Sequence, residues 1–373
     1  MLLDKDRIRL LILTEATTCL PGQHVTGVLR VEVLKEVSVT AIRLMARGQE
    51  AVFFKAKKDR FTITRQQSFV HFEHLITFFG FSKECGRRGG ASLAPGIYEY
   101  PFDFEIPASA PPTYNCHTSA GDAEIAYVLR AIADIPRGFD KRTEIPLYVL
   151  PTIASQQYEQ LCRTDKTMVT RDIPLAVEPG CFGRSRDPKA SVTLSVSVPA
   201  VTLLPWCSCG NTSPASSPTA TNYLNVHLSL MNTSLKTPIR TVRVTLSQHQ
   251  HLIAQGDSYN TIQPIVSVVV SPPGGELIPR ASAALDVKLR LPRSLRHLSK
   301  MPQSVPLPTL ATPCIQTSNL LTISFPGLGA DALVNMSDAT VIGAAVDYDS
   351  RVPMIPCLYT MATIRPEDKL GGE

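Results

Sequence analysis

The stretch Gly96 to Pro136 reads GIYEYPFDFEIPASAPPTYNCHTSAGDAEIAYVLRAIADIP and contains two runs in which every second residue is apolar. In the first run, Tyr98 to Ile106, the apolar even positions alternate with Glu99, Pro101, Asp103 and Glu105. In the second run, Ile125 to Ile135, every odd position is apolar. A period of two predicts β-strands with one buried and one solvent-facing side. A slip of one residue would expose each apolar set, so the register of both strands is strongly specified.

The same alternation is found on both sides of this stretch. It predicts strands at Ile8–Ile12, Val25–Val33 and Ile145–Val149 in the first half of the chain, and at Val192–Val198, Leu224–Leu230 and Leu285–Leu291 in the second half. A change of parity after Val39 predicts a bulge or a strand break near Ala41. Many short alternating strands separated by turn residues favour antiparallel β-sandwiches over parallel βαβ units.

Two segments have a less clear pattern. Within residues 53–90, Phe69, Phe72 and Phe79 fit one face of a short helix, whereas Val70, Phe72 and His74 fit a strand, so both alternatives remain open. Residues 151–170 are polar and weakly patterned, which places the connection between two domains there. Within it, Ile153 to Leu161 fits one or two turns of helix.

The composition is that of a globular protein. A chain of 373 residues predicts two or three domains, and 44% apolar with 18% charged residues suits a strand-rich fold that needs no metal or disulfide. The uncharged apolar run near the start, Leu10 to Leu13, is shorter than the ~7–15 residues of a signal peptide, and no run approaches the ~20 residues of a membrane span. Nine cysteines without a CxxC pair indicate free thiols in a reducing compartment.

A longer pattern is superimposed on the alternation. It consists of a Pro-Gly turn, a strand of alternating aromatic residues, a proline-rich loop and a returning strand, carried by Leu93, Pro95, Gly96, Tyr98, Tyr100, Pro101, Phe102, Phe104, Ile106, Pro107, Pro111, Pro112, Tyr114, Gly121, Ile125, Tyr127, Leu129 and Ala131. This order resembles the amino-terminal domain of the α-arrestins, the arrestin-domain-containing proteins. Pro21, Gly22, Val25 and Gly27 are similar to the opening hairpin of that family, and Leu224–Gln248 is similar to the central hairpin of its carboxy-terminal domain.

The resemblance implies an all-β chain with two tandem antiparallel immunoglobulin-like β-sandwich domains, the arrestin fold. We expect the first domain at residues 1–152, the connection at 153–170 and the second domain at 171–365. Residues 201–223 form a serine- and proline-rich loop where the family has a tight Pro-Gly-Glu hairpin. The resemblance also implies a non-catalytic adaptor or scaffold, cytoplasmic with peripheral association to the plasma membrane or endosomes. Such a protein couples membrane cargo or receptors to endocytic and endosomal trafficking.

Residue patterns for catalysis or cofactor binding are missing from the sequence. There is no GxSxG motif and no GKS or GKT after a glycine-rich loop, and Gly327–Gly329 lacks the third glycine of a dinucleotide loop. His71 and His74 near Cys85 lack a second pair of metal ligands. We therefore predict a protein without enzymatic activity, cofactor or metal.

Two clusters of basic residues are candidates for a binding surface: Lys55, Lys57, Lys58 and Arg60, and then Arg87 and Arg88. They are either ordinary solvated loops or, as the resemblance suggests, a surface for acidic lipid head groups or phosphorylated receptor tails. Aromatic residues are not interleaved with them, which argues against nucleic acid as a partner.

Pro111, Pro112 and Tyr114 match the PPxY ligand of WW domains, through which α-arrestins recruit HECT-type ubiquitin ligases. In that family the motif lies in a carboxy-terminal tail, whereas here it falls in a loop between two predicted strands. We interpret it as structural. The resemblance still implies trafficking or ubiquitination machinery as partners, with ligase recruitment left open.

Two other functions fit the same fold. A coat subunit similar to the small retromer component would be held in a complex with stable stoichiometric partners. An extracellular adhesion protein would have paired cysteines and glycans on the sequons at Asn211, Asn232 and Asn335. Affinity purification distinguishes the first from an adaptor, and intact mass with thiol counting distinguishes the second.

Overall fold

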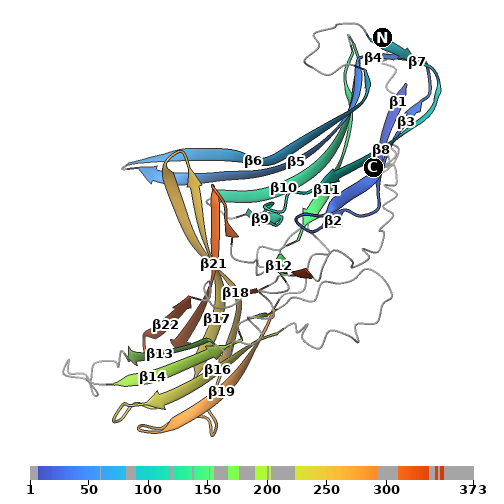
Figure 1. Ribbon diagram of the computed structural model, residues 1–373. Helices are drawn as coiled ribbons and strands as arrows, with labels where there is room; N and C mark the ends of the chain where they lie inside the picture. Colours follow the sequence, from blue (N-terminus) through green and yellow to red (C-terminus); the bar gives the residue numbers. More distant parts are fainter. Residues whose placement is uncertain are drawn as a thin grey trace, which may run out of the picture.

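The computed structural model describes residues 7–58, 60–80, 90–117, 121–136, 138–150, 152–154, 167–175, 190–199, 201–202, 223–291, 310–335, 341–342 and 345–347. Every regular element in these ranges is a β-strand (Figure 1). The strands form two antiparallel β-sandwiches, which confirms the predicted all-β fold with two tandem sandwiches. Within the same ranges, no helix could span a membrane.

The first sandwich packs a small sheet against a large one. The small sheet has the order β1-β3-β8, formed by Ile8–Thr14, His24–Val33 and Gly96–Glu105. The large sheet has the order β2-β11-β10-β5-β6, formed by Thr18–Cys19, Lys141–Val149, Gly121–Asp134, Ala41–Lys58 and Phe61–Gly80. β9 (Tyr114–His117) also pairs with β10, and β4 (Val37–Val39) pairs with β7 (Ala91–Leu93).

The second sandwich contains two sheets of similar size. One has the order β13-β14-β16-β19, formed by Thr167–Pro174, Ser191–Val198, Tyr223–Asn232 and Ser282–Arg290. The other has the order β18-β17-β21-β20 with β22 paired to β21, formed by Asp257–Val270, Val242–Ala254, Ile315–Phe325, Leu310–Ala311 and Ala330–Asn335. Two short parallel pairs complete the fold: β12 with β24 (Thr152–Ala154, Ala345–Asp347) and β15 with β23 (Val201–Thr202, Val341–Ile342).

The two alternating runs that define the fold become β8 and β10, which lie in the two different sheets of the first sandwich. Their apolar sides face the shared core, where Phe104 is 4% exposed and Ile125 is fully buried. Aromatic rings connect the layers, since Phe78 of β6 stacks on Tyr100 of β8 with ring centroids 5.2 Å apart. The predicted one-sided burial of both strands is therefore confirmed.

Three local predictions can be compared directly with the strands. β4 ends at Val39 and β5 begins at Ala41, so the predicted strand break is confirmed. Residues 61–80 form a strand whose backbone pairs with β5 along its whole length, so the helical alternative there is wrong. The predicted hairpin over Leu224–Gln248 is also wrong, because β16 and β17 lie in different sheets.

The segment between the sandwiches is only partly described. Ile153 lies in the short strand β12, whereas residues 155–161, which fit a helical turn, are outside the described ranges. β13 begins at Thr167, inside the segment 153–170 that was expected to be the connection. Most of the long loop at 201–223 is also outside the described ranges, apart from β15 and Tyr223.

Each sandwich has its own hydrophobic core, but the first core also includes residues from the second half of the chain. These residues are Leu252, Ala254, Leu310, Cys314 and Ile315. They lie at the end of β17, in β20 and at the turn that leads into β21, where the second sandwich meets the large sheet of the first (Figure 1). The two sandwiches therefore share an apolar junction.

Gly27 tests the close packing of the first sandwich. A Cβ atom at this position in β3 would overlap the Leu13 carbonyl oxygen of β1 and lie 2.5 Å from Phe102 Cζ of β8. Because backbone would have to move, Gly27→Ala is expected to lower the free energy of unfolding by ~1–3 kcal/mol, measured by urea denaturation.

The control for Gly27 is Arg30→Ala on the same strand. Arg30 pairs with Glu99 at 2.8 Å on a partly exposed surface, so its loss should lower the free energy of unfolding by less than about 1 kcal/mol. A Gly27→Ala variant as stable as the control would contradict the packing described here.

Candidate functional site

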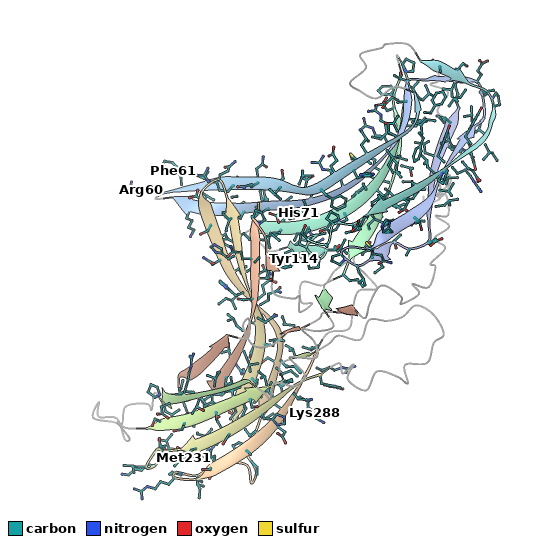
Figure 2. All side chains as sticks on the ribbon, in the orientation of Figure 1. Arg60, Phe61, His71, Tyr114, Met231 and Lys288 are labelled. Carbon is teal, nitrogen blue, oxygen red and sulfur yellow. The ribbon has the colours of Figure 1, made fainter. Side chains whose placement is uncertain are left out.

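The β5–β6 hairpin carries most of the described basic candidates to one exposed tip. Lys55, Lys57 and Arg60 are exposed there, and Phe61, the first residue of β6, is 74% exposed. Figure 2 shows Arg60 and Phe61 at the free end of the hairpin. Lys58 ends β5, but its side chain is not described, and Arg87 and Arg88 lie outside the described ranges.

The chemistry of this tip combines positive charge with an exposed aromatic ring. Lysine and arginine side chains are attracted to an anionic surface, and a phenyl ring gains free energy when it enters the head-group region of a bilayer. The sequence pattern indicates the cations but not Phe61, although this ring directly follows the basic turn KAKKDR. We call Lys55, Lys57, Arg60 and Phe61 the basic tip.

The outer part of the same hairpin is supported by the second sandwich. Arg65 Nε of β6 lies 2.5 Å from Asp257 Oδ2 at the start of β18, and the Gln255 backbone N–H donates to Gln67 Oε1 at 2.8 Å. Phe54 of β5 stacks on Tyr259 of β18 with ring centroids 5.9 Å apart. The β17–β18 turn therefore contacts β5 and β6 and fixes how the hairpin projects.

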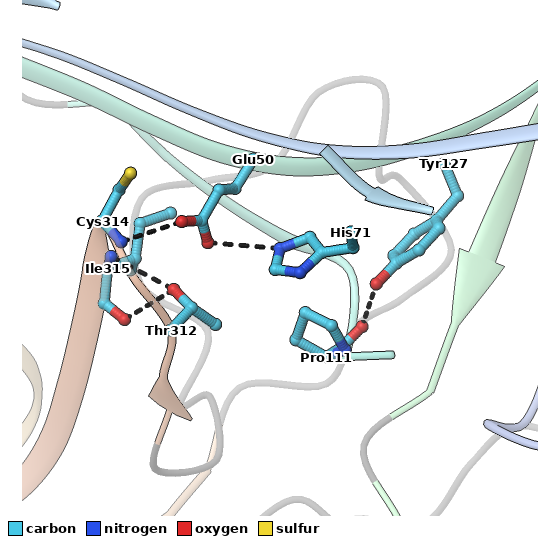
Figure 3. Close-up of polar contacts among 7 residues, drawn as sticks. All are labelled: Glu50, His71, Pro111, Tyr127, Thr312, Cys314 and Ile315. Carbon is cyan, nitrogen blue, oxygen red and sulfur yellow. Dashed lines mark hydrogen bonds and ion pairs between the residues drawn. The ribbon is translucent and has the colours of Figure 1, made fainter. Parts of the chain in front are cut away.

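A buried carboxylate lies at the centre of this junction (Figure 3). Glu50 of β5 is fully buried, and its Oε1 accepts the Cys314 backbone N–H at 2.8 Å. Its Oε2 lies 3.3 Å from His71 Nε2. His71 is the extra residue of a β-bulge, since Gly48 pairs with Phe72 and Gln49 with Val70. Bulges turn a side chain in a new direction, which accounts for the position of His71 beside Glu50.

The turn that presents Cys314 is itself held in one conformation. Thr312 Oγ1 donates to the Ile315 carbonyl oxygen at 2.8 Å and accepts the Ile315 N–H at 3.1 Å (Figure 3). The Ile253 N–H donates to the Cys314 carbonyl oxygen at 2.9 Å, which ties the turn to β17. Glu50 therefore joins the first sandwich to a rigid part of the second.

The three described cysteines are free and buried. Burial raises the pKa of the Cys19 thiol to about 12, and burial together with Glu50 raises the pKa of the Cys314 thiol to about 12. Cys116 Sγ donates to Gln250 Oε1 at 3.1 Å across the junction, and burial raises its pKa as well. Protonated thiols are poor nucleophiles and poor metal ligands, so these three act as packing groups.

The PPTY sequence is part of the folded first sandwich. Tyr114 is fully buried in β9, and burial raises its pKa. The Thr113 N–H donates to the Val149 carbonyl oxygen at 2.8 Å, and the Tyr127 hydroxyl donates to the Pro111 carbonyl oxygen (Figure 3). In this conformation a WW domain could not reach Tyr114.

The remaining polar candidates are also engaged in the fold. His74 stacks on Phe104 with ring centroids 6.2 Å apart, and the described ranges contain no cluster of three His, Cys, Asp or Glu residues that could hold a metal ion. Cys85 lies outside those ranges. Asn232 is fully buried and its amide donates to the Thr237 and Leu277 carbonyl oxygens, so a glycan on this sequon would not fit the fold.

Glu50 provides a test of the junction. Glu50→Ala leaves the buried Cys314 N–H without an acceptor, so the free energy of unfolding should fall by ~1–3 kcal/mol. Hydrogen exchange of the Cys314 amide should also become faster, because the hydrogen bond that protects it is lost. Denaturant unfolding and hydrogen-exchange mass spectrometry measure the two effects.

The matched control is Glu73→Ala. Glu73 pairs with Arg47 at 3.3 Å, but both side chains are more than one-third exposed, so the expected loss is below about 1 kcal/mol. Equal losses from the two substitutions, or unchanged exchange at Cys314 in Glu50→Ala, would show that the carboxylate does not tie the sandwiches together.

Tyr114 provides a test of the PPTY sequence. Tyr114→Ala removes a fully buried aromatic side chain, so it should lower the free energy of unfolding by ~3–5 kcal/mol. A synthetic peptide spanning Pro111–Tyr114 should bind a WW domain at least about 100-fold more tightly than the folded protein does, measured by calorimetry. Equal affinities would mean that Tyr114 is accessible in the folded chain.

The first sandwich matches a known protein family. Residues 12–156 match the family described as Arrestin (or S-antigen), N-terminal domain. The matched range contains nearly all of the first sandwich, including the β5–β6 hairpin and the basic tip. A comparison with curated proteins gives no match. Residues 12–156 therefore form an arrestin-family N-terminal domain.

Proposed function

We propose that this protein is an intracellular adaptor that couples membrane cargo or receptors to endocytic and endosomal trafficking. Arrestin-family proteins are in general adaptors rather than enzymes, which supports a role in binding. The observation that carries the proposal is the basic tip, an exposed group of Lys55, Lys57, Arg60 and Phe61 at the free end of the N-terminal domain.

The strength of a membrane contact at this tip can be estimated. Three cations near an anionic surface contribute about 1 kcal/mol each, and burial of a phenyl ring contributes about 1.5–3 kcal/mol. A sum of about 5 kcal/mol corresponds to a Kd on the order of 0.1 mM. The tip alone therefore gives weak and reversible association with a membrane, and stable recruitment requires a second contact with cargo.

An anionic bilayer fits the tip better than a phosphorylated receptor tail does. Both carry negative charge that would attract the cations, but only the bilayer also offers an apolar phase to Phe61, which is 74% exposed. Recruitment of a ubiquitin ligase through Tyr114 is not part of the proposal, because that side chain is fully buried.

The membrane contact can be tested with liposomes that contain phosphatidylserine. The triple substitution Lys55→Glu, Lys57→Glu and Arg60→Glu should weaken binding at least about tenfold, and Phe61→Ser should weaken it as well. Cosedimentation measures the bound fraction, and added salt should reduce the binding of the wild-type protein.

The control for charge reversal is Lys288→Glu with Arg290→Glu. Both residues are exposed on β19 of the second sandwich, away from the basic tip (Figure 2 labels Lys288). These changes should leave liposome binding close to that of the wild-type protein. If the control and the tip variants lose binding equally, the tip has no special role; if neither loses binding, the membrane part of the proposal is wrong.

Partner stoichiometry tests the adaptor role itself. Quantitative affinity purification from native cells should recover membrane cargo and trafficking proteins in amounts well below that of the adaptor, because such contacts are transient. Recovery of one set of partners at constant stoichiometry would instead identify a coat subunit.

A further inference from the structure

The first ten residues of β6, Phe61–Val70, form an open edge of the large sheet. The strand order ends at β6, which pairs with β5 on one side. Figure 1 shows β6 along the outer rim of the sheet, and no strand of the described ranges lies beyond it. Eight of these ten side chains are exposed, and only Ile63 and Arg65 are half-buried. We call Phe61–Val70 the open edge.

The other edge strands of nine or more residues in the described ranges, β8, β18 and β19, carry features that discourage pairing. Edge strands are commonly protected by proline, bulges or charged side chains. β8 has Pro101 in its middle, β18 has Pro264 and a register shift beside it, and β19 has Asp286, Lys288 and Arg290.

The open edge, FTITRQQSFV, lacks these features. It has no proline, no bulge and one charged residue, Arg65, which is paired with Asp257. It is also rich in residues that favour strands. Its backbone is therefore a ready template for another strand.

We propose that the open edge pairs with the same edge of a second copy of this chain, in antiparallel orientation about a two-fold axis near Gln66. The open edge has apolar residues at both ends and polar residues in its centre, of which only Arg65 is charged. Antiparallel pairing about Gln66 places Ile63 opposite Phe69 of the partner subunit and Arg65 opposite Gln67 of the partner subunit. Apolar side chains then meet each other, whereas a parallel pairing in register would place the two Arg65 side chains together.

The surroundings of the open edge are compatible with this pairing. β6 contacts Asp257 and Gln255 through the side chains of Arg65 and Gln67, so these contacts do not use its backbone. Because they already hold the strand extended, pairing with a second copy orders little additional chain. In the antiparallel dimer the two Phe61 residues are ten residues apart along the paired strands, about 33 Å. This exceeds the screening length of about 8 Å at physiological salt, so the two basic tips repel each other weakly.

The first experiment measures self-association of the full chain. Sedimentation over an about hundredfold concentration range should show a reversible monomer–dimer equilibrium without larger species, because a two-fold interface closes on itself. Gln66→Lys with Ser68→Lys places like charges across the axis and should weaken the dimer at least about tenfold. Ser282→Lys with Ala284→Lys, at exposed positions on the edge strand β19, is the matched control and should dimerise like the wild-type chain.

The second experiment locates the axis by disulfide formation. Directly opposed residues in antiparallel strands have Cα atoms about 4.5–5.5 Å apart, within the range that a disulfide spans. Gln66→Cys should therefore give a disulfide-linked dimer on mild oxidation. Thr62→Cys on the same edge should not, because its two copies would be eight residues apart, about 27 Å. The wild-type chain, with its nine cysteines, gives the background.

Several results would overturn the proposal. They are a monomer at every concentration, a continuous series of larger species, a dimer unaffected by the lysines on the open edge, or equal cross-linking of Gln66→Cys and Thr62→Cys. If the lysine variant fails to fold by circular dichroism, the cysteine pair decides the question, because it leaves the charge of the edge unchanged. The inference does not depend on the proposed adaptor role, since a dimer can form whether or not liposomes are bound.

Discussion

The pairing of β10 with β5 is the constraint on which the rest of the structure depends. Fourteen residues of β10 pair in an unbroken register with β5, from Gly121 opposite Phe54 to Asp134 opposite Ala41. The inward residues of β10, such as Ile125 and Leu129, are fully buried, so a slip of one residue would move them into water. β5 continues beyond this pairing to Lys58. The register that buries the core therefore also determines how far the β5–β6 hairpin projects.

The register of β10 and β5 is constrained by apolar burial. The junction between the two sandwiches is constrained in addition by polar contacts. Removing a carboxylate from water costs several kcal/mol, and Glu50 is compensated by the Cys314 N–H and by His71. An apolar residue of similar size would avoid that cost but would not select one position of the Cys314 turn. Arg65 of β6 and Asp257 of β18 form a second polar contact between the two sandwiches, nearer the surface than Glu50. We infer that the polar contacts set the orientation of the sandwiches, while residues such as Leu252 and Ile315 supply most of the burial.

The sequence predicts those parts of the fold in which each strand has one buried face. The alternation in β1, β8, β10 and β14 follows directly from one-sided burial, and the burial of those strands confirms it. β6 could not be assigned because most of its residues from Phe61 to Val70 are exposed, and because the bulge at His71 interrupts the alternation in the part that fitted both a helix and a strand. Glu50 resembles any surface acid in the sequence, because Cys314 is 264 residues away and nothing local indicates that the two meet.

The open edge, the outer part of β6, has no fully buried face, and this has two consequences. It removes the apolar pattern by which the strand could be recognised, and it leaves the backbone edge and Phe61 in solvent. A long exposed strand of this kind is prone to unspecific pairing unless a specific partner covers it. The contacts of Arg65 and Gln67 with the second sandwich keep the strand in place without covering its edge. The backbone of the open edge is thus held in an extended conformation while its outer side stays unpaired. Specific pairing with another strand requires both conditions.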